Sequence, residues 1–240
     1  MKDKIKSISY VIPVYNEQKR LKILLKEILF FKKKYKKIDS EFIVINDGSD
    51  DKSYQILKKA EENYKFIRLI NLQKNYGKGY ALRKGVINAK KNFIVTIDAD
   101  LSVKFNQTLI WFNKYKINSK NTVYFASRNH KLSKVKFKFH RKFIGLILSL
   151  FVYFFVDKSL KDTQCGFKLY SNKIAKKIFK RLTTKGFSHD IEIIFILKKM
   201  NKKIYELPVN WIHRNNSKVN LITEPFKFIA NILLLKIKYF

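Results

Sequence analysis

Short apolar runs alternate with amphipathic stretches along the first half of the chain. The runs are four to eight residues long and rich in β-branched and aromatic side chains, as is typical of buried strands. They predict five strands, at residues 8–14, 41–46, 66–72, 93–97 and 122–126. Between them apolar residues recur at helical spacing, which predicts helices over 17–35, from Asp50 or Asp51 to 62, and over 79–89. The alternation indicates an α/β fold with a mostly parallel sheet flanked by helices.

A different pattern follows, in which apolar and basic residues occur together. Residues 134–142 are basic and aromatic, and residues 143–156 are almost wholly apolar. As a helix the apolar run spans about 21 Å, against roughly 30 Å of hydrocarbon in a bilayer. It is either a buried core helix or a helix lying in the membrane interface. Residues 226–240 repeat the combination, with aliphatic residues beside three lysines, which favours the interfacial interpretation.

These patterns predict how the chain is divided. Residues 1–222 are expected to form one catalytic domain, with 143–156 as its possible membrane-interface element. Residues 223–240 are expected to add a C-terminal amphipathic helix. A length of 240 residues suits one sizeable core, and an apolar fraction of 46% excludes a disordered chain.

The charge balance limits the classes of molecule that the chain is expected to bind. The chain has 52 Lys and Arg against 18 Asp and Glu, a net charge of +34. Such a field attracts anionic lipids, phosphorylated substrates and nucleic acid, although part of the excess is expected to be lysines solvated on helix faces. Only seven of the basic residues are arginines, the residue that reads guanine edges, so no specific nucleic-acid partner is expected. Near an anionic membrane each lysine adds roughly 1 kcal/mol of attraction.

Cysteine content and targeting signals indicate the compartment. The single cysteine, Cys165, cannot form an intramolecular disulfide, which favours a reducing environment. The first residues lack the apolar stretch and cleavage site of a signal peptide, and no run reaches the roughly 20 apolar residues of a spanning helix.

Polar residues gather where the predicted strands end, at residues 13–17, 46–49 and 98–100. In an open parallel sheet, ligands bind outside the carboxyl ends of the strands. Each segment alone is also a common turn former. Together they bring four carboxylates to one crevice, where the charges repel one another unless a cation compensates. A hard divalent ion bridging carboxylate and phosphate oxygens is the natural compensation. The four carboxylates are those of Glu17, Asp47, Asp98 and Asp100.

In order and spacing, these segments resemble the motifs of the family 2 inverting glycosyltransferases. The resemblance begins at residues 10–17, 46–49 with Asp51, 75–79 and 98–100, and it continues at 126–128, 162–169, 190–192, 206–211 and 217–219. The later segments are most similar to the dolichyl-phosphate β-glucosyltransferase branch, with polyprenyl-phosphate mannosyltransferases as neighbours. The resemblance covers nearly the whole chain and implies the GT-A fold, a Rossmann-like sheet flanked by helices.

The resemblance also implies a donor site. A Mg²⁺ or Mn²⁺ ion held by Asp100, with Asp98 close by, would neutralise the diphosphate of a nucleotide-sugar as the bond to the sugar breaks. Asp98 is expected to face the nucleotide as well. The remaining donor-binding residues implied by the family are Pro13, Tyr15, Glu17, Asp47, Lys78 and Ala99.

For the acceptor, the resemblance implies a polyprenyl phosphate. Asp190 lies where the family places a carboxylate that deprotonates an alcohol. A phosphate monoester has a second pKa near 6, by analogy with phosphorylated side chains, so it is already ionised at neutral pH and needs no strong base. It needs cations that hold one anion beside another. Arg128 and Arg141 are the expected cations, because a guanidinium fork matches phosphate geometry.

The activity implied is transfer of glucose from UDP-glucose onto a polyprenyl (dolichyl-type) phosphate at the cytoplasmic face of a membrane. Three alternatives remain: a mannosyltransferase that uses GDP-mannose, a family 2 enzyme that acts on a polysaccharide hydroxyl, and a non-catalytic basic module that binds membranes or nucleic acid. Eukaryotic enzymes of this branch carry an N-terminal membrane helix, whereas here the catalytic domain is expected to begin at the first residues. Peripheral attachment would then depend on the two apolar and basic segments.

Overall fold

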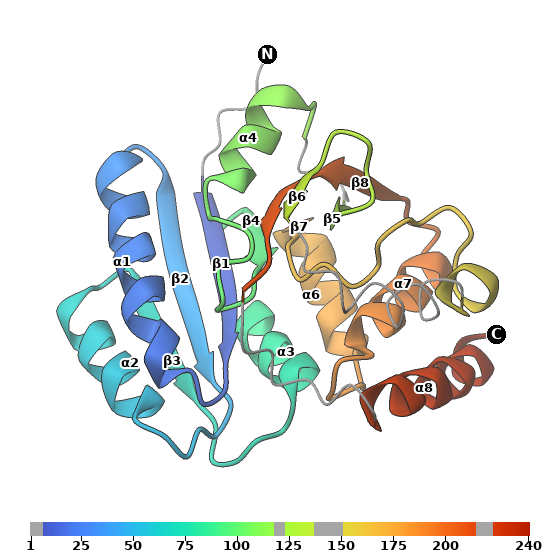
Figure 1. Cartoon of the computed structure of the whole chain (residues 1–240), viewed down its shortest axis with the longest axis horizontal. Coiled ribbons are helices and arrows are strands. Elements are labelled where there is room, and N and C mark those ends of the chain that lie inside the picture. Colours follow the sequence, from blue (N-terminus) through green and yellow to red (C-terminus); the bar gives the residue numbers. More distant parts are fainter. Residues whose placement is uncertain (1–6, 118–122, 137–150, 215–222) are drawn as a thin grey trace.

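The computed structural model describes residues 7–117, 123–136, 151–214 and 223–240 (Figure 1). A seven-stranded sheet forms its centre, in the order β3-β2-β1-β4-β7-β5-β8. The strands are β1 Ser7–Val14, β2 Asp39–Asn46, β3 Ile67–Asn71, β4 Phe93–Thr96, β5 Val123–Ser127, β7 Lys168–Ser171 and β8 Ile204–Pro208. A second sheet pairs β6, Lys134–Lys136, with β9, Asn210–Ile212.

The strand directions bear out a mostly parallel sheet. β1 pairs in parallel with both β2 and β4, and β5 pairs in parallel with β8. β7 is the exception, because it runs antiparallel to β4 on one side and to β5 on the other. The five strands expected from the apolar runs are confirmed to within two residues at each end. β7 was not expected, since its four residues include a lysine and are too few for a clear alternation.

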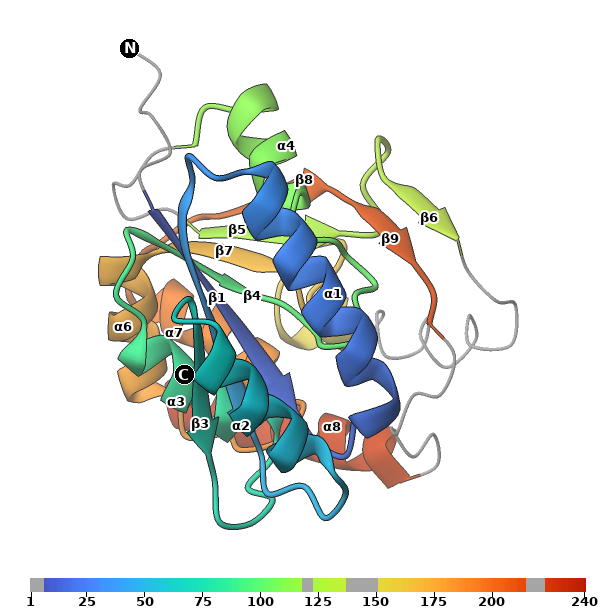
Figure 2. The ribbon, with the colours of Figure 1, turned by 90° about the vertical axis from the view of Figure 1, so that its left-hand side faces the viewer.

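Helices cover both faces of the sheet (Figure 2). On one face, α1, α2 and α4 contribute to the core that contains Tyr10 and Phe42. On the other face, α3, α6, α7 and α8 contribute to the core that contains Val11 and Ile43. Adjacent residues of one strand thus enter opposite cores, as the pleat requires. The helices are α1 Gln18–Lys34, α2 Ser53–Asn63, α3 Lys78–Asn88, α4 Gln107–Lys114, α6 Asn172–Arg181, α7 His189–Lys199 and α8 Thr223–Tyr239.

Helix α7 is buried on every side over residues 189–197, which places its acidic residues inside the protein. The C-terminal helix α8 packs against it at the lower right of Figure 1, with Phe228, Ile232 and Leu235 turned inward. The opposite side of α8 leaves Leu234 and Ile237 exposed. A helix therefore lies where a C-terminal amphipathic helix was predicted, and its placement at a membrane interface stays a prediction.

Only the end of the apolar run 143–156 lies within the described residues. Residues 151–155 are helical, with Val152 and Val156 buried and Tyr153 and Phe154 exposed. This part therefore has one face in the core and one outside it, and residues 143–150 lie outside the described part. Among the helices that the structure describes, none has the length and apolar character needed to cross a membrane.

Candidate active site

The turns after β1 and β2 are joined by side chains that hold the starts of α1 and α2 together. Asn16 adopts a left-handed backbone with φ of 53°, a conformation that asparagine tolerates better than most residues. Its amide donates to Oγ of Ser49 at 2.9 Å, and its side-chain Oδ1 accepts the amide of Asp50 at 2.8 Å. Oγ of Ser53 accepts the amide of Glu17 at 3.0 Å. The first two strand ends thus form one rigid rim.

Asp47 lies buried at the end of β2, where its carboxylate holds a neighbouring turn. One oxygen accepts the amide of Tyr76 at 2.9 Å and the other accepts the amide of Gly77 at 2.8 Å. Burial raises the pKa of Asp47, and these two amides oppose that rise. The observed role of Asp47 is to fix the turn that delivers Lys78 to the first position of α3. Its expected contact with the nucleotide stays a prediction.

Lys78 and Asp98 form an ion pair at the centre of the strand ends, with Nζ and Oδ1 separated by 2.6 Å. Burial alone would lower the pKa of Lys78, but Asp98, Asp190 and Asp100 together raise it. Asp98 rests against Gly166, where an added Cβ would lie 2.3 Å from Oδ2. The structure therefore joins Lys78, Asp98 and Asp190, which the sequence had assigned to one site from positions far apart.

Asp190 is buried in the first turn of α7, beside Lys168 and His189. Its Oδ1 lies 2.6 Å from Nζ of Lys168 and 3.3 Å from Nε2 of His189. Burial would raise the pKa of Asp190, but His189, Lys168 and Lys78 outweigh it and hold that pKa below its ordinary value. Lys168 also donates to the carbonyl of Cys165 at 2.7 Å. The carboxylate is thus ionised and fixed in position.

Asp100 lies beside a cavity of about 130 Å³. Its Oδ1 accepts the amide of Ser102 at 2.8 Å and its Oδ2 accepts the hydroxyl of the same residue at 2.9 Å. Leu101 between them has a positive φ of 56°, which marks a sharply turned backbone. The cavity is lined by Arg20, Ile23, Ala99, Asp100, Leu101 and Arg214.

Arg128 follows β5 and pairs with Asp162. Its Nε and Nη2 donate to the two carboxylate oxygens at 2.6 and 2.8 Å, and its backbone amide adds a third bond of 2.8 Å. The guanidinium also lies 5.6 Å from the ring centroid of Trp211. These contacts fix Arg128 in place, and its role toward a phosphate stays a prediction. Arg141, the other expected cation, lies outside the described residues.

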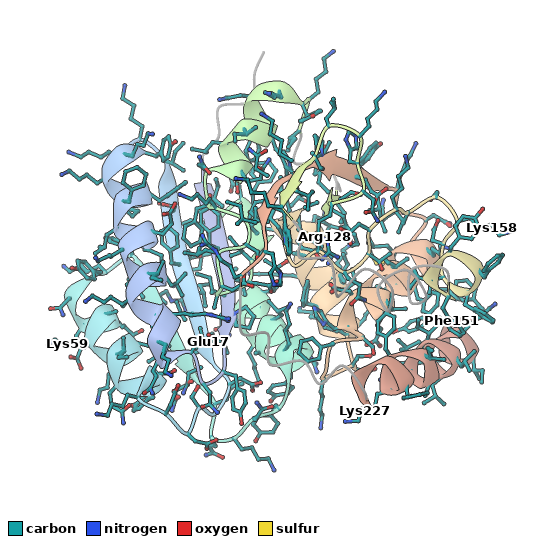
Figure 3. All side chains as sticks on the ribbon, viewed as in Figure 1. Glu17, Lys59, Arg128, Phe151, Lys158 and Lys227 are labelled. Atoms are coloured by element: carbon teal, nitrogen blue, oxygen red, sulfur yellow. The ribbon has the colours of Figure 1, made fainter. Side chains whose placement is uncertain are left out.

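The remaining donor-site residues surround the end of β1. Pro13 is partly buried within the strand, and Ala99 is buried after β4. Tyr15 is 36% exposed, with its hydroxyl 3.5 Å from Asp50. Glu17 pairs with Arg20 at 3.1 Å, one turn into α1. Figure 3 shows Glu17 at the lower end of α1 and Arg128 nearer the middle of the molecule, so the two lie on separate parts of the site.

The carboxylates predicted to hold a metal are ligands that a hard divalent cation accepts. Within the described residues, no group of three or more His, Cys, Asp or Glu side chains is arranged to hold a metal by itself. Mg²⁺ usually takes only one or two carboxylates, together with substrate phosphates and water. Asp98 and Asp100 stay the predicted pair of such ligands, and Asp100 lines a cavity.

Three site residues were not assigned a role from the sequence: Lys168, Asp162 and Gly166. Lys168 is a lysine between Phe167 and Leu169 in an apolar stretch, and a buried lysine normally has a charged partner. The sequence therefore indicated that Lys168 has a charged partner, but it did not show that this partner is Asp190. Cys165 is also buried, and burial raises the pKa of its thiol to about 12, so it is no nucleophile at neutral pH.

Comparison with known proteins shows to which family the chain belongs. The profile of the family described as glycosyl transferase family 2 matches residues 9–179. A dolichyl-phosphate β-glucosyltransferase of Homo sapiens is 31% identical, with 98% of this chain and 76% of that protein aligned. Two others, from Trichomonas vaginalis and Saccharomyces cerevisiae, are each 30% identical over 97% of this chain and over 73% and 75% of their own lengths.

Solved structures show the same fold at low sequence identity. Glucosyl-3-phosphoglycerate synthase of Mycobacterium tuberculosis, solved with UDP, has a TM-score of 0.67 and 16% identity, over 98% of this chain and 82% of that one. A mannosyltransferase of Pyrobaculum calidifontis, solved with GDP-Man and Mn²⁺, has a TM-score of 0.60 and 16% identity, over 99% and 64%. The GT-A fold expected from the sequence is confirmed. From its family profile, its curated relatives and its fold, the chain belongs to glycosyltransferase family 2 and is a glycosyltransferase.

Proposed function

We propose that this enzyme transfers glucose from UDP-glucose onto a polyprenyl (dolichyl-type) phosphate at a membrane surface, with inversion at the sugar. An oxygen of the phosphate monoester attacks the anomeric carbon, the bond from that carbon to the diphosphate breaks, and UDP leaves. The names of the curated relatives support the sugar and the class of acceptor, because they match across almost the whole chain.

The pairing of Asp190 with Lys168 is the observation that carries the choice of acceptor. A general base works best when its pKa lies near the working pH. The pKa of Asp190 is instead held below its ordinary value by the neighbouring His189, Lys168 and Lys78. Such a carboxylate is a weak base, and it suits an acceptor oxygen that is already ionised. It is less suited to a sugar hydroxyl, because that acceptor must lose a proton to a base.

The donor is proposed to bind across the strand ends, with its diphosphate beside Asp98, Asp100 and Lys78. Asp98 and Asp100 would hold a divalent cation, Mg²⁺ or Mn²⁺, which would neutralise charge on the leaving group. Lys78 adds a fixed positive charge beside the same group, and its raised pKa keeps it protonated at neutral pH. The base and ribose are proposed to bind at Asp47 and at residues 13–17, which include Pro13, Tyr15 and Glu17.

Membrane attachment is proposed through α8 and residues 151–155. The outward side of α8 exposes Leu234 and Ile237, and Lys227 and Lys236 are exposed on the same helix. An apolar stripe flanked by lysines is the pattern by which helices lie in the interface of anionic bilayers. Figure 3 shows Phe151 and Lys227 by α8, and Nζ of Lys236 lies 5.3 Å from the ring centroid of Phe155. The two elements therefore form one continuous surface.

The proposal is tested by offering purified protein a short polyprenyl phosphate with UDP-glucose, GDP-mannose or other nucleotide-sugars. Product mass identifies the sugar, and the proton coupling at the anomeric carbon reports inversion. We expect a glucosyl phospholipid from UDP-glucose alone, lost with EDTA and restored by Mg²⁺ or Mn²⁺. A product from GDP-mannose alone would favour the mannosyltransferase, and transfer only to a saccharide would favour the polysaccharide enzyme.

A further inference from the structure

Glu192 is a charged residue whose side chain has no exposed surface and which the proposed reaction does not use. Its Oε1 accepts hydrogen bonds from Oγ1 of Thr183 at 2.7 Å, Nζ of Lys238 at 2.9 Å and the hydroxyl of Tyr239 at 2.8 Å. Its Oε2 accepts the amides of Thr183 at 3.0 Å and Thr184 at 2.6 Å. A buried carboxylate needs such donors to stay ionised. Glu192 thereby joins α7 to the 183–186 segment and to the last turn of α8.

The 183–186 segment packs against the start of α3, on both sides of Lys78. The carbonyl of Lys185 accepts the amide of Tyr80 at 3.1 Å. A Cβ on Gly77 would lie 2.6 Å from the oxygen of Lys185, and a Cβ on Gly79 would lie 2.5 Å from the oxygen of Thr184. The first amides of a helix have no partner within the helix, so the segment completes the first turn of α3.

Helix α8 also reaches the site at a second point. Nδ2 of Asn231 donates to Oγ of Ser188 at 3.2 Å. Ser188 is the N-cap residue of α7 and directly precedes His189 and Asp190. The C-terminal helix therefore contacts both backbone segments that carry the site, the start of α7 directly and the start of α3 through Glu192 and residues 183–186.

We propose that Glu192 is a positioning residue that makes the last turn of α8 part of the donor site. Lys238 and Tyr239 hold Glu192, Glu192 holds the 183–186 segment against α3, and the segment keeps Lys78 beside Asp98. This inference rests on the proposed function in that Lys78 contacts the donor and α8 lies at the lipid surface. Seating α8 on the lipid and binding the donor then stabilise the same set of contacts, so each strengthens the other.

The test removes the α8 donors and leaves Glu192 and the exposed apolar side of α8 unchanged. The variant is Lys238→Met with Tyr239→Phe, and Tyr239→Phe alone is the milder version. The matched control is Asp157→Asn, which removes a carboxylate 3.0 Å from Lys198, a lysine in the last turn of α7. The readouts are hydrogen exchange of the Tyr80 amide, measured by NMR, and dissociation constants for UDP and GDP, measured by calorimetry.

In the double variant we expect the Tyr80 amide to exchange about tenfold faster and the preferred nucleoside diphosphate to bind about tenfold more weakly, since two hydrogen bonds to a charged group are lost. In turnover assays the KM for the donor rises while kcat stays within about twofold, because ground-state positioning is what changes. Tyr239→Phe alone gives a smaller change in the same direction, and Asp157→Asn gives none.

Equal Tyr80 exchange in the double variant and the Asp157→Asn control would overturn the inference, and so would faster exchange with unchanged affinity for the nucleotide. A wild-type preference for GDP would overturn the proposed donor and leave the inference standing where exchange and GDP affinity change together. If the wild type binds neither nucleotide, the proposed donor is wrong. The inference is then wrong as well, because Lys78 would have no donor to contact.

Discussion

The ammonium group of Lys78 lies 2.6 Å from Oδ1 of Asp98, so the first residue of α3 neutralises the first carboxylate of the 98–100 motif. Two features of the neighbouring segments make this contact possible. Asp47 holds the turn before α3, and Gly166 leaves room for the carboxylate of Asp98. The ion pair combines an anion suited to a metal with a cation suited to a phosphate. In the proposed function, Lys78 would face the departing diphosphate and Asp98 would help to hold the metal.

Replacing Lys78 with methionine is expected to weaken UDP binding by about ten- to hundredfold, because a charge-assisted contact to the diphosphate is lost. Calorimetry with UDP measures the change. Lys84→Met is the control, since Lys84 is an exposed lysine on the same helix. Equal affinities in the two variants would show that Lys78 does not contact the donor.

Replacing Gly166 with alanine is expected to lower transfer by about a hundredfold while the fold is retained. The new Cβ would lie within 2.6 Å of the Asp98 carboxylate and displace it, and a shift of about 1 Å at a catalytic group has an effect of this size. Gly186→Ala is the control, because nothing lies within 4 Å of the Cβ added there. Circular dichroism checks the fold, and a fully active Gly166→Ala enzyme would contradict the assignment of Asp98.

Lys168 and Asp190 form a buried ion pair, and we expect the losses of stability caused by replacing each of them to be strongly non-additive. Lys168→Met and Asp190→Asn should each lower the free energy of unfolding by about 3–5 kcal/mol, because each leaves a buried charge short of its partner. The double variant should lose clearly less than the sum, since it leaves neither charge behind. Urea denaturation of the four proteins measures the cycle, and additive losses would mean that the two side chains stabilise the fold independently.

The stability of the fold should depend on pH through Glu192. Burial alone would raise the pKa of Glu192, but the amide of Thr184 and the side chains of Lys238 and Thr183 lower it from 4.5 to about 2. A lowered pKa in the folded state means that the carboxylate contributes stability above about pH 4.5, which is lost as the pH falls toward 2. The free energy of unfolding should therefore fall more steeply over this range in the wild type than in Glu192→Gln. Parallel curves would show that Glu192 titrates normally.

Replacing Leu234 and Ile237 with glutamate should release the enzyme from anionic vesicles. These side chains are 64% and 80% exposed, so the change adds negative charge to the proposed lipid-facing side without opening the core. Co-sedimentation with vesicles measures binding. Leu132→Glu is the control, since Leu132 is 63% exposed in the turn before β6. Unchanged binding of the double variant would exclude this side of α8 as the attachment surface.

The sequence by itself determined the first five strands, and it predicted where the site lies. Each strand is a local run of β-branched and aromatic residues, so a short window contains all the information needed to find it. The site followed from the same runs, because parallel strands bring their carboxyl ends to one edge of a sheet. Glu17, Asp47, Asp98 and Asp100 were therefore assigned to one crevice, and the family resemblance added Lys78 without knowledge of its contact with Asp98.

Only the tertiary structure decided which charged groups are partners. Lys168 pairs with Asp190, 22 residues away in the sequence, and Arg128 pairs with Asp162, 34 residues away. The local pattern around each residue shows that a charge is present, but it does not show which backbone segments approach one another. That depends on β7 entering the sheet between β4 and β5, and on α8 packing against α7. Pairing over long separations is set by the packing of whole elements, and no window of sequence contains it.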